Sequence, residues 1–153
     1  PQVTSSLIAL DDDVQEAAEN ALTPTDDAAG AETPAPQAPD EDGIYTAKDD
    51  VAAYLNAYGK LPGNFITKEE ARSLGWSGGG LDEYAYGMCI GGDRFGNNEG
   101  LLPEAAGRTY CECDVDTLHA DERGAKRIVY SNDGLIYYTD DHYESFTLLY
   151  GNP

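Results

Sequence analysis

The chain has 153 residues, which suffices for one domain of ordinary size with some length left over. Its formal net charge of −20 argues against a protein that grips long nucleic acids through a broad basic face. A small enzyme that concentrates a few cations in one cleft is still compatible with that charge. No run approaches the roughly 20 apolar residues of a membrane helix, so we expect no membrane span in this chain.

Residues 1–42 form an acidic segment with 11 acidic residues, no lysine or arginine and no aromatic residue. A Pro/Ala-rich run over 28–39 is typical of a linker, and apolar residues at helical spacing between 7 and 21 favour only a marginal helix. We therefore predict a disordered tether or pro-segment. The alternative is self-inhibition, in which the tethered acids occupy a cationic cleft at high effective concentration.

The folded domain is predicted over 43–153, with helices before strands. Thr46–Asp49 resembles a capping box and predicts a helix that stops at Gly59. Thr67–Glu70 is a cleaner capping box for a second, short helix, and 81–86 predicts one more helical turn. Five strands are expected over 88–95, 109–115, 127–131, 135–139 and 145–150. This order predicts an α+β domain in which short N-terminal helices pack on an antiparallel sheet of about five strands.

The three cysteines, Cys89, Cys111 and Cys113, form an odd set without the two-pair spacing of a zinc site. Cys111 and Cys113 stand two apart in a predicted strand, so both point to the same face. We expect either three buried small hydrophobic residues or one disulfide with one free thiol. Metal binding is a third alternative.

Two side chains are candidates for proton transfer. Glu112 alternates with the two strand cysteines, so it faces a cleft if they face the core. His142 lies in an aromatic strand-and-turn context, whereas His119 lies in a polar loop. A carboxylate base and a histidine acid are what RNA cleavage by transesterification needs, because a 2′-hydroxyl must lose a proton and a 5′-oxygen must gain one.

Arg123 and Arg127 flank the next strand and supply fixed, bidentate donors for a phosphate. Each residue taken singly also fits a structural role. A strand glutamate is often solvated, a lone histidine is often structural, and arginines often neutralise nearby acids such as Asp114 or Asp116. The residues alone leave both interpretations open.

The order and spacing of longer stretches favour the chemical interpretation. The chain resembles the barnase family of secreted microbial guanyl-preferring ribonucleases from about Thr46 to Leu149. The matching stretches are LPGNFITKEEARSLGW, IGGDRFGNNEGLLP, GRTY, KRIVYSNDGLIYYT and DHYESFT. The resemblance implies the microbial ribonuclease fold and a metal-independent, cofactor-free endoribonuclease that cleaves single-stranded RNA on the 3′ side of guanosine.

The resemblance also implies the roles of individual residues. Glu112 is expected as the general base and His142 as the general acid, with Lys68, Arg123 and Arg127 stabilising the phosphate. The guanine-reading loop is expected to comprise Gly96, Asn97, Asn98, Glu99 and Gly100. Phe95 and Tyr143 are expected to sandwich or flank the base, although both also fit a purely core role. Arg108 and Asp133 are expected to form a structural ion pair.

Three positions depart from the family pattern. Asn98 replaces a common arginine of the guanine loop, Glu122 replaces an aromatic residue beside a subsite, and Gly134 replaces a buried tryptophan. These changes leave the catalytic pair in place. They predict weaker substrate binding and poorer recognition by the acidic, barstar-like inhibitor that the family implies as a partner.

Several functions remain compatible with the sequence. The leading one is a monomeric, secreted ribonuclease, with a tether to the cell surface through residues ahead of Pro1 as a variant. A toxin-like effector held off by an acidic immunity protein shares its chemistry. An inactive RNA- or protein-binding module would be distinguished by the lack of any RNA cleavage.

Overall fold

The structure, a computed structural model, describes residues 38–153. The helix predicted between residues 7 and 21, and most of the predicted tether, lie outside the described residues. The elements in chain order are α1 (Lys48–Tyr58), β1 (Phe65–Ile66), α2 (Lys68–Ser73), β2 (Cys89–Phe95), β3 (Tyr110–Asp114), β4 (Arg127–Ser131), β5 (Ile136–Thr139) and β6 (Thr147–Tyr150). The predicted α+β order is confirmed. In the described part of the chain neither helix is long and apolar enough to cross a membrane.

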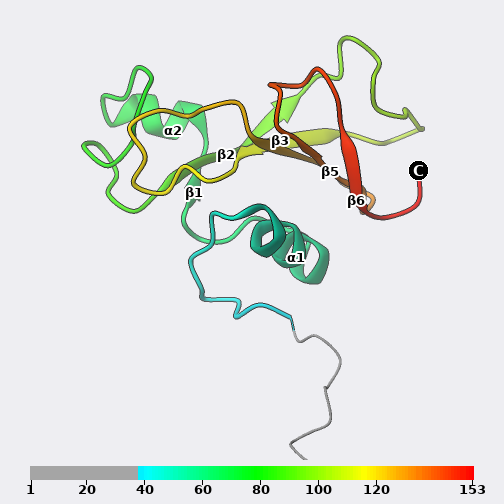
Figure 1. The fold of residues 1–153 in the computed structure, drawn as a ribbon, viewed down its shortest axis with the longest axis horizontal. Helices are drawn as coiled ribbons and strands as arrows, with labels where there is room; N and C mark the ends of the chain where they lie inside the picture. Colours follow the sequence, from blue (N-terminus) through cyan, green and yellow to red (C-terminus); the bar gives the residue numbers. More distant parts are fainter. Residues whose placement is uncertain (1–37) are drawn as a thin grey trace, which may run out of the picture. The chain divides into compact units, whose positions relative to one another are not determined.

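The strands form one sheet in the order β1-β2-β3-β4-β5-β6. Five of them are those that the alternating sequence pattern predicts, and these five pair with one another in antiparallel fashion. The sixth, β1, contributes two residues and pairs in parallel with β2. The prediction of about five strands missed it because two residues are too short to display alternation. Figure 1 shows α1 packed on one side of the sheet and α2 beside the β1–β2 end.

The start of α1 differs from the prediction. Its N-cap is Ala47 and no side chain caps it, so the expected capping box at Thr46–Asp49 is wrong. The hydroxyl of Thr46 instead accepts hydrogen bonds from the backbone amides of Thr117 and Leu118, at 3.0 and 3.2 Å. A long-range partner has displaced the local one, which a local pattern does not reveal. The predicted stop is confirmed, since Gly59 has a left-handed φ of 71° and donates to the carbonyl of Leu55.

The capping box of α2 is confirmed. The Thr67 side chain accepts from the amide of Glu70, and the Glu70 carboxylate accepts from the amide of Thr67. This helix buries Ala71 in a small cluster with Trp76, Leu81 and Ile90. The predicted helical turn over 81–86 is a hydrogen-bonded turn, in which the amides of residues 84 and 85 donate to the carbonyl of Leu81.

Alternating side chains divide the sheet into two faces. One face packs on α1 through a cluster of buried residues, Val51, Ala52, Leu55, Cys113, Val115, Ile128 and Ile136. The opposite face carries a second cluster, Leu102, Tyr110, Val129, Leu135 and Tyr137. Ile128 and Val129 are neighbours in β4 but belong to different clusters, as the two-residue period of a strand requires. Glu112 in β3 shares its face with the second cluster.

Residues just ahead of the predicted domain start also contact α1. The hydroxyls of three tyrosines donate to three successive backbone carbonyls, from Tyr58 to Pro39, Tyr45 to Asp40 and Tyr54 to Glu41. The distances are 2.5, 3.1 and 2.6 Å, in that order. We call residues 39–41 the strap, because these bonds fix it to the helix side of the domain.

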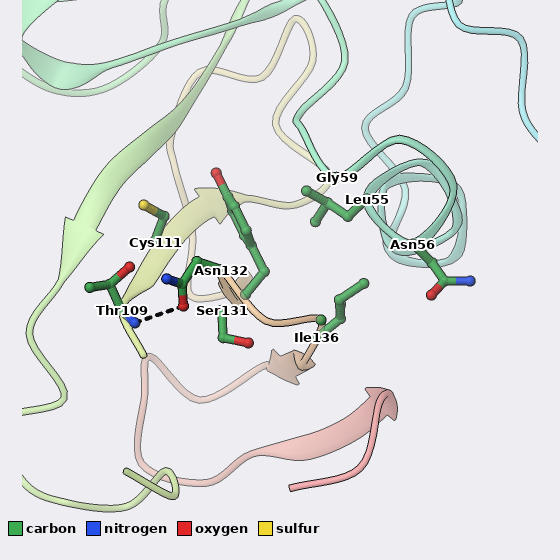
Figure 2. A pocket seen from close by; sticks show the side chains of 10 residues that line it. Leu55, Asn56, Gly59, Thr109, Cys111, Ser131, Asn132 and Ile136 are labelled. Carbon is green, nitrogen blue, oxygen red and sulfur yellow. Dashed lines mark hydrogen bonds between the residues drawn. The ribbon is translucent and has the colours of Figure 1, made fainter. Parts of the chain in front are cut away.

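On the α1 side of the sheet lies a hollow of about 400 Å³, shown in Figure 2. We call it the helix-side hollow; the last turn of α1, the strand residues Cys111, Tyr130 and Ile136, and the β4–β5 turn line it. Gly59 and Gly134 both border the hollow, and an added Cβ at either would meet nothing within 4 Å. The resemblance implies a buried tryptophan where Gly134 stands, and the glycine leaves its border of the hollow without a side chain.

The three cysteines are free thiols. Cys89 and Cys113 are buried, as the first alternative expects, and Cys111 is half-buried at the helix-side hollow. Burial raises the pKa of each thiol. Among residues 38–153 no three His, Cys, Asp or Glu side chains converge as a metal site would require.

Candidate functional site

The face opposite α1 holds a cleft of about 520 Å³. Its lining comprises Phe95, Gly96, Asn97, Asn98, Glu99, Leu101, Glu112, His142, Tyr143, Glu144 and Phe146. These residues come from the end of β2 and the loop after it, from the middle of β3, and from the turn between β5 and β6. The fold thus gathers into one space eight of the site residues that the sequence singled out. We call this space the cleft.

Glu112 projects into the cleft from the centre of the sheet. Its strand neighbour in β2 is Asp93, because a bulge between Gly91 and Asp93 shifts the register there by one residue. The Nζ atom of Lys68 lies 3.9 Å from Oε2 of Glu112. The backbone amide of Lys68 donates to the Asp93 carboxylate at 3.0 Å, which fixes the start of α2 beside the cleft. Lys68 is therefore held where its charge can meet both Glu112 and an incoming anion.

The other oxygen of Glu112 is occupied by a neighbour. The hydroxyl of Tyr143 donates to Oε1 of Glu112. Burial and this hydrogen bond raise the pKa of Tyr143, so the phenol keeps its proton and stays a donor. A hydroxyl group of a ligand that bonds to Glu112 would compete with Tyr143 for that oxygen.

The two arginines share one buried carboxylate. Arg123 donates two hydrogen bonds of 2.8 Å to Asp114, and Nε of Arg127 lies 3.2 Å from the same side chain. Asp114 is 1% exposed and Arg127 2%, so the contact between these two is almost fully desolvated, whereas the Arg123 side chain is 24% exposed. The guanidinium of Arg127 also faces the Tyr143 ring at 6.0 Å. The two arginines thus pair with Asp114, one of the acids that the structural interpretation named, and neither lines the cleft.

The loop after β2 is organised by Asn97. This residue is 7% exposed and has a positive φ of 52°. Its side-chain amide donates to the Leu102 carbonyl at 2.9 Å and to Glu104, while its carbonyl oxygen accepts from the Leu102 amide at 3.1 Å. The Asn97 side chain is thus engaged in holding the loop, whereas Glu99 is exposed and presents its carboxylate to the cleft.

Aromatic rings form one wall of the cleft. Phe95 and Tyr143 stack on each other with ring centroids 5.2 Å apart and an interplanar angle of 27°. Phe146 meets the Phe95 ring edge-on at 6.2 Å. Because the first two rings already stack on each other, a planar ligand can stack beside the pair, whereas insertion between the rings requires one of them to move. Both rings also pack against the second core cluster.

The turn between β5 and β6 presents His142. The His142 ring is exposed at the cleft, and its backbone amide donates to the Ala125 carbonyl at 3.1 Å. His142 and Tyr143 have φ values of 57° and 76°, in the left-handed region that disfavours side chains by roughly 1–2 kcal/mol per residue. His119, the other histidine, lies outside the cleft, where its Nδ1 is 2.8 Å from Asp82.

Some contributors to the site did not emerge from the sequence. Asp114 entered only as an acid that the arginines neutralise, yet it shares the strand alternation of Glu112, which indicates that both lie on one face. Leu101, Glu144 and Phe146 line the cleft and lie within stretches that carry the family resemblance. The predicted ion pair of Arg108 and Asp133 is confirmed at 2.8 Å. The hydrogen bond from the Lys68 amide to Asp93 was not predicted either. It lies beside the bulge in β2, and the only sign of that bulge in the local sequence is the Gly91-Gly92 pair.

Chemically, the cleft combines a carboxylate that can accept a proton and an imidazole that can donate one, and the Lys68 ammonium lies beside the carboxylate. Lys68 stands 3.9 Å from the carboxylate, Arg123 and Arg127 are held by Asp114 in the same strand, and a further carboxylate faces the same space from the loop after β2. Such a set suits proton transfer at an anionic group of a ligand. The further carboxylate suits a neighbouring part of the same ligand that carries N–H donors.

Known proteins share this sequence pattern. A family model described as ribonuclease matches residues 48–150. A ribonuclease of Bacillus intermedius is 54% identical over 101 residues, which is 65% of this chain and 62% of the relative. The match therefore spans less than two thirds of that protein. A ribonuclease of Heyndrickxia coagulans is 53% identical over 100 residues, covering 64% of this chain and 91% of the relative. Guanyl-specific ribonuclease St of Saccharopolyspora erythraea is 49% identical over 57 residues, 37% of this chain and 56% of the relative.

Proposed function

This chain belongs to the ribonuclease family, and from that premise we propose that it is an endoribonuclease that cleaves single-stranded RNA on the 3′ side of guanosine. The observation that carries the proposal is the shared cleft: Glu112, His142 and Glu99 face one space of about 520 Å³. The relative named as guanyl-specific supports the choice of base.

In the first step, Glu112 takes the proton of the 2′-hydroxyl as the 2′-oxygen attacks the phosphorus atom. The bond to the 5′-oxygen breaks, and that oxygen receives a proton from His142, which leaves a 2′,3′-cyclic phosphate. In the second step His142 takes a proton from water as the water oxygen attacks the phosphorus. The bond to the 2′-oxygen breaks, and Glu112 returns a proton to that oxygen, which leaves a 3′-phosphate. The proximity of Lys68 to Glu112, 3.9 Å, supports a role in stabilising the charge that builds on the phosphate. Arg123 and Arg127 are proposed to act likewise, from the positions that Asp114 fixes.

Base recognition is assigned to the loop that Asn97 holds. The Glu99 carboxylate accepts hydrogen bonds from the two N–H groups on one edge of guanine, and amides of residues 96–99 donate to the base carbonyl. Adenine presents a different pattern of donors and acceptors at that edge, so it loses these bonds. The base stacks beside Phe95 and Tyr143, which is worth roughly 1–3 kcal/mol.

Digestion of short oligonucleotides tests the proposal. An RNA with a single guanosine should be cut once, on its 3′ side, to give a cyclic phosphate that slowly opens, while the matching DNA should stay intact because it lacks the 2′-hydroxyl. A chelator should leave the rate unchanged. Cleavage of the DNA at an equal rate, or loss of activity with the chelator, would contradict the mechanism. No cleavage of any RNA would favour a binding module.

Base recognition has its own test. Glu99→Ala should lower the rate at guanosine sites and leave the slower rate at adenosine sites almost unchanged, so that the ratio of the two falls. A matched control is Glu83→Ala, which removes an exposed carboxylate that does not line the cleft. The wild-type ratio in Glu99→Ala would show that another group reads the base.

We also propose that the enzyme acts outside the cell as a monomer and that an acidic, barstar-like protein is a candidate inhibitor. Asn98 and Glu122 offer no positive charge to such a partner, so binding should be weaker than for relatives with an arginine and an aromatic residue there. Assays of culture medium, a sedimentation experiment and titration with barstar test these three points.

A further inference from the structure

The turn that carries His142 and Tyr143 is organised around one carboxylate that does not enter the cleft. Asp141 accepts a hydrogen bond from the Thr139 hydroxyl at 2.7 Å and from the backbone amides of Glu144 and Ser145 at 3.1 and 2.9 Å. Its second oxygen accepts from the Ser145 hydroxyl at 2.5 Å. One side chain thus ties the residue before His142 to the two residues after Tyr143.

Thr139 extends this arrangement into the sheet. It is 1% exposed at the end of β5, and its Oγ1 accepts from the backbone amide of Tyr143 at 3.1 Å. Together, Asp141 and Thr139 close the turn on both sides of the two residues with positive φ. Such a backbone conformation persists only where its surroundings hold it, because both side chains disfavour it.

We propose that Asp141 is the positioning residue of the general acid: its carboxylate holds the turn in the one conformation that aims the His142 imidazole at the leaving oxygen. This inference rests on the proposed function, since it concerns the same reaction. Asp141 does not line the cleft, and its hydrogen bonds go to Thr139, Glu144 and Ser145 of the same turn, so it acts through His142 and not on the substrate.

The charge state of Asp141 suits the role. The hydrogen bonds from Ser145 and Thr139 lower the pKa of Asp141 to about 2, so the carboxylate is an acceptor throughout the working range of the enzyme. A catalytic group must be held within about 0.5 Å of its productive place, and a misplacement of about 1 Å can cost on the order of 100-fold in rate. Loosening the turn should therefore act on the chemical step, whereas guanine recognition by the loop after β2 is untouched.

The experiment measures kcat and KM for an oligonucleotide with one guanosine. Asp141→Ala should lower kcat by about 10- to 100-fold with a much smaller change in KM, because the loop after β2 keeps its bonds to guanine and only the stacking of Tyr143 shares the loosened turn. Asp141→Asn keeps an acceptor oxygen for the two amides and should recover most of kcat. The matched control is Asp140→Ala, which removes the adjacent, exposed carboxylate and should leave both constants unchanged. An equal loss in Asp140→Ala and Asp141→Ala would overturn the proposal in favour of a general charge effect.

A double mutant separates positioning from a structural role. In a His142→Ala background, Asp141→Ala should reduce kcat by no more than about twofold, because the group it positions is gone. The same reduction in both backgrounds would overturn the inference. If His142→Ala alone leaves kcat unchanged, the proposed function fails; if it abolishes turnover while Asp141→Ala does not lower kcat, only the positioning role fails.

Ser145→Ala covers the case in which Asp141→Ala does not fold, as judged by circular dichroism. It deletes one hydrogen bond of the turn and leaves Asp141 in place. A drop in kcat of a few fold at unchanged KM supports the proposal, and wild-type kcat contradicts it.

Discussion

The same strands contribute side chains with different roles to the two faces of the sheet. On the α1 face, β3 and β4 contribute Cys113 and Ile128 to an apolar cluster, where packing alone is required. On the cleft face, the same strands contribute Glu112 and Arg127, which are held by hydrogen bonds and ion pairs. Positive φ at His142 and Tyr143 also occurs on the cleft side.

This difference indicates which substitutions should change stability and which should change activity. The cleft face accepts buried charge and backbone strain, each of which costs stability and persists only when neighbouring groups fix it. The α1 face tolerates a hollow of about 400 Å³ but contains no charged group in its core cluster. Substitutions on the cleft face should therefore change rates, and substitutions on the α1 face should change the free energy of unfolding.

The largest effect is expected at the proposed catalytic pair. Glu112→Ala and His142→Ala should each lower kcat by on the order of 10²–10⁴-fold, because each removes a proton-transfer group. The folded structure should remain, since His142 is exposed and the core clusters are untouched. Steady-state kinetics and circular dichroism on the same samples measure both properties. A variant that keeps more than about a tenth of wild-type kcat would mean that the residue has another role.

Ile128→Ala should produce the converse result. This side chain is 0% exposed in the cluster against α1, and truncation of a buried isoleucine costs about 2–5 kcal/mol of unfolding free energy. Urea unfolding measures the loss, and kcat of the folded enzyme should stay near the wild-type value. Leu148→Ala, in the exposed edge strand β6, is a control that should cost far less. If kcat of the folded enzyme falls in parallel with the unfolding free energy, packing on the α1 face must affect the activity of the cleft face.

The strap should matter to the α1 side alone. A chain that begins at Gly43 loses the three tyrosine hydrogen bonds of residues 39–41, whereas one that begins at Ala38 keeps them. We expect the shorter chain to be less stable by about 1–2 kcal/mol, since each bond contributes roughly 0.5–1.5 kcal/mol before the cost of ordering the strap. Thermal unfolding compares the two chains. Identical unfolding midpoints would mean that the strap does not stabilise the domain.

The smallest effect concerns acid. The pKa of Asp141 is lowered from 3.8 to about 2 on folding, so this group contributes stability that is present above pH 3.8 and is lost as the pH falls through about 2. Asp141→Asn should therefore be less stable than the wild type at pH 6, and the difference should shrink between pH 4 and pH 2. Urea unfolding across this range checks the sign. A difference that grows on acidification would be incompatible with the lowered pKa.

Much of the fold could be predicted because its signals are local. The alternation around Glu112 assigned the correct face to it, and the pair Thr67 and Glu70 located a helix start to the residue. Both signals depend on neighbours one to four positions away, which a single sequence contains.

The remaining features depend on partners distant in the chain. The Thr46 hydroxyl accepts hydrogen bonds from backbone amides 71 and 72 residues further on, so it does not cap α1 as expected. The Tyr143 hydroxyl meets Glu112 across 31 positions, and Asp93 meets Glu112 only because a bulge shifts the strand register. The direct stack of Phe95 on Tyr143 likewise requires the folded sheet. None of these contacts has a spacing that a sequence pattern marks.

The pairing of both arginines with Asp114 has a consequence for ionic strength. An arginine whose charge is already offset by a protein carboxylate neutralises less of a phosphate, so RNA binding releases fewer of the counterions condensed on the RNA than a count of three cations implies. Each freely exposed contact to a single strand would contribute about 0.7 to the slope of log affinity against log salt, and here the slope should be shallower. The net charge of −20 also repels a polyanion at long range, and added ions screen that repulsion. Added salt, which lowers the RNA affinity of a basic RNA-binding protein, should therefore lower the RNA affinity of this protein only slightly.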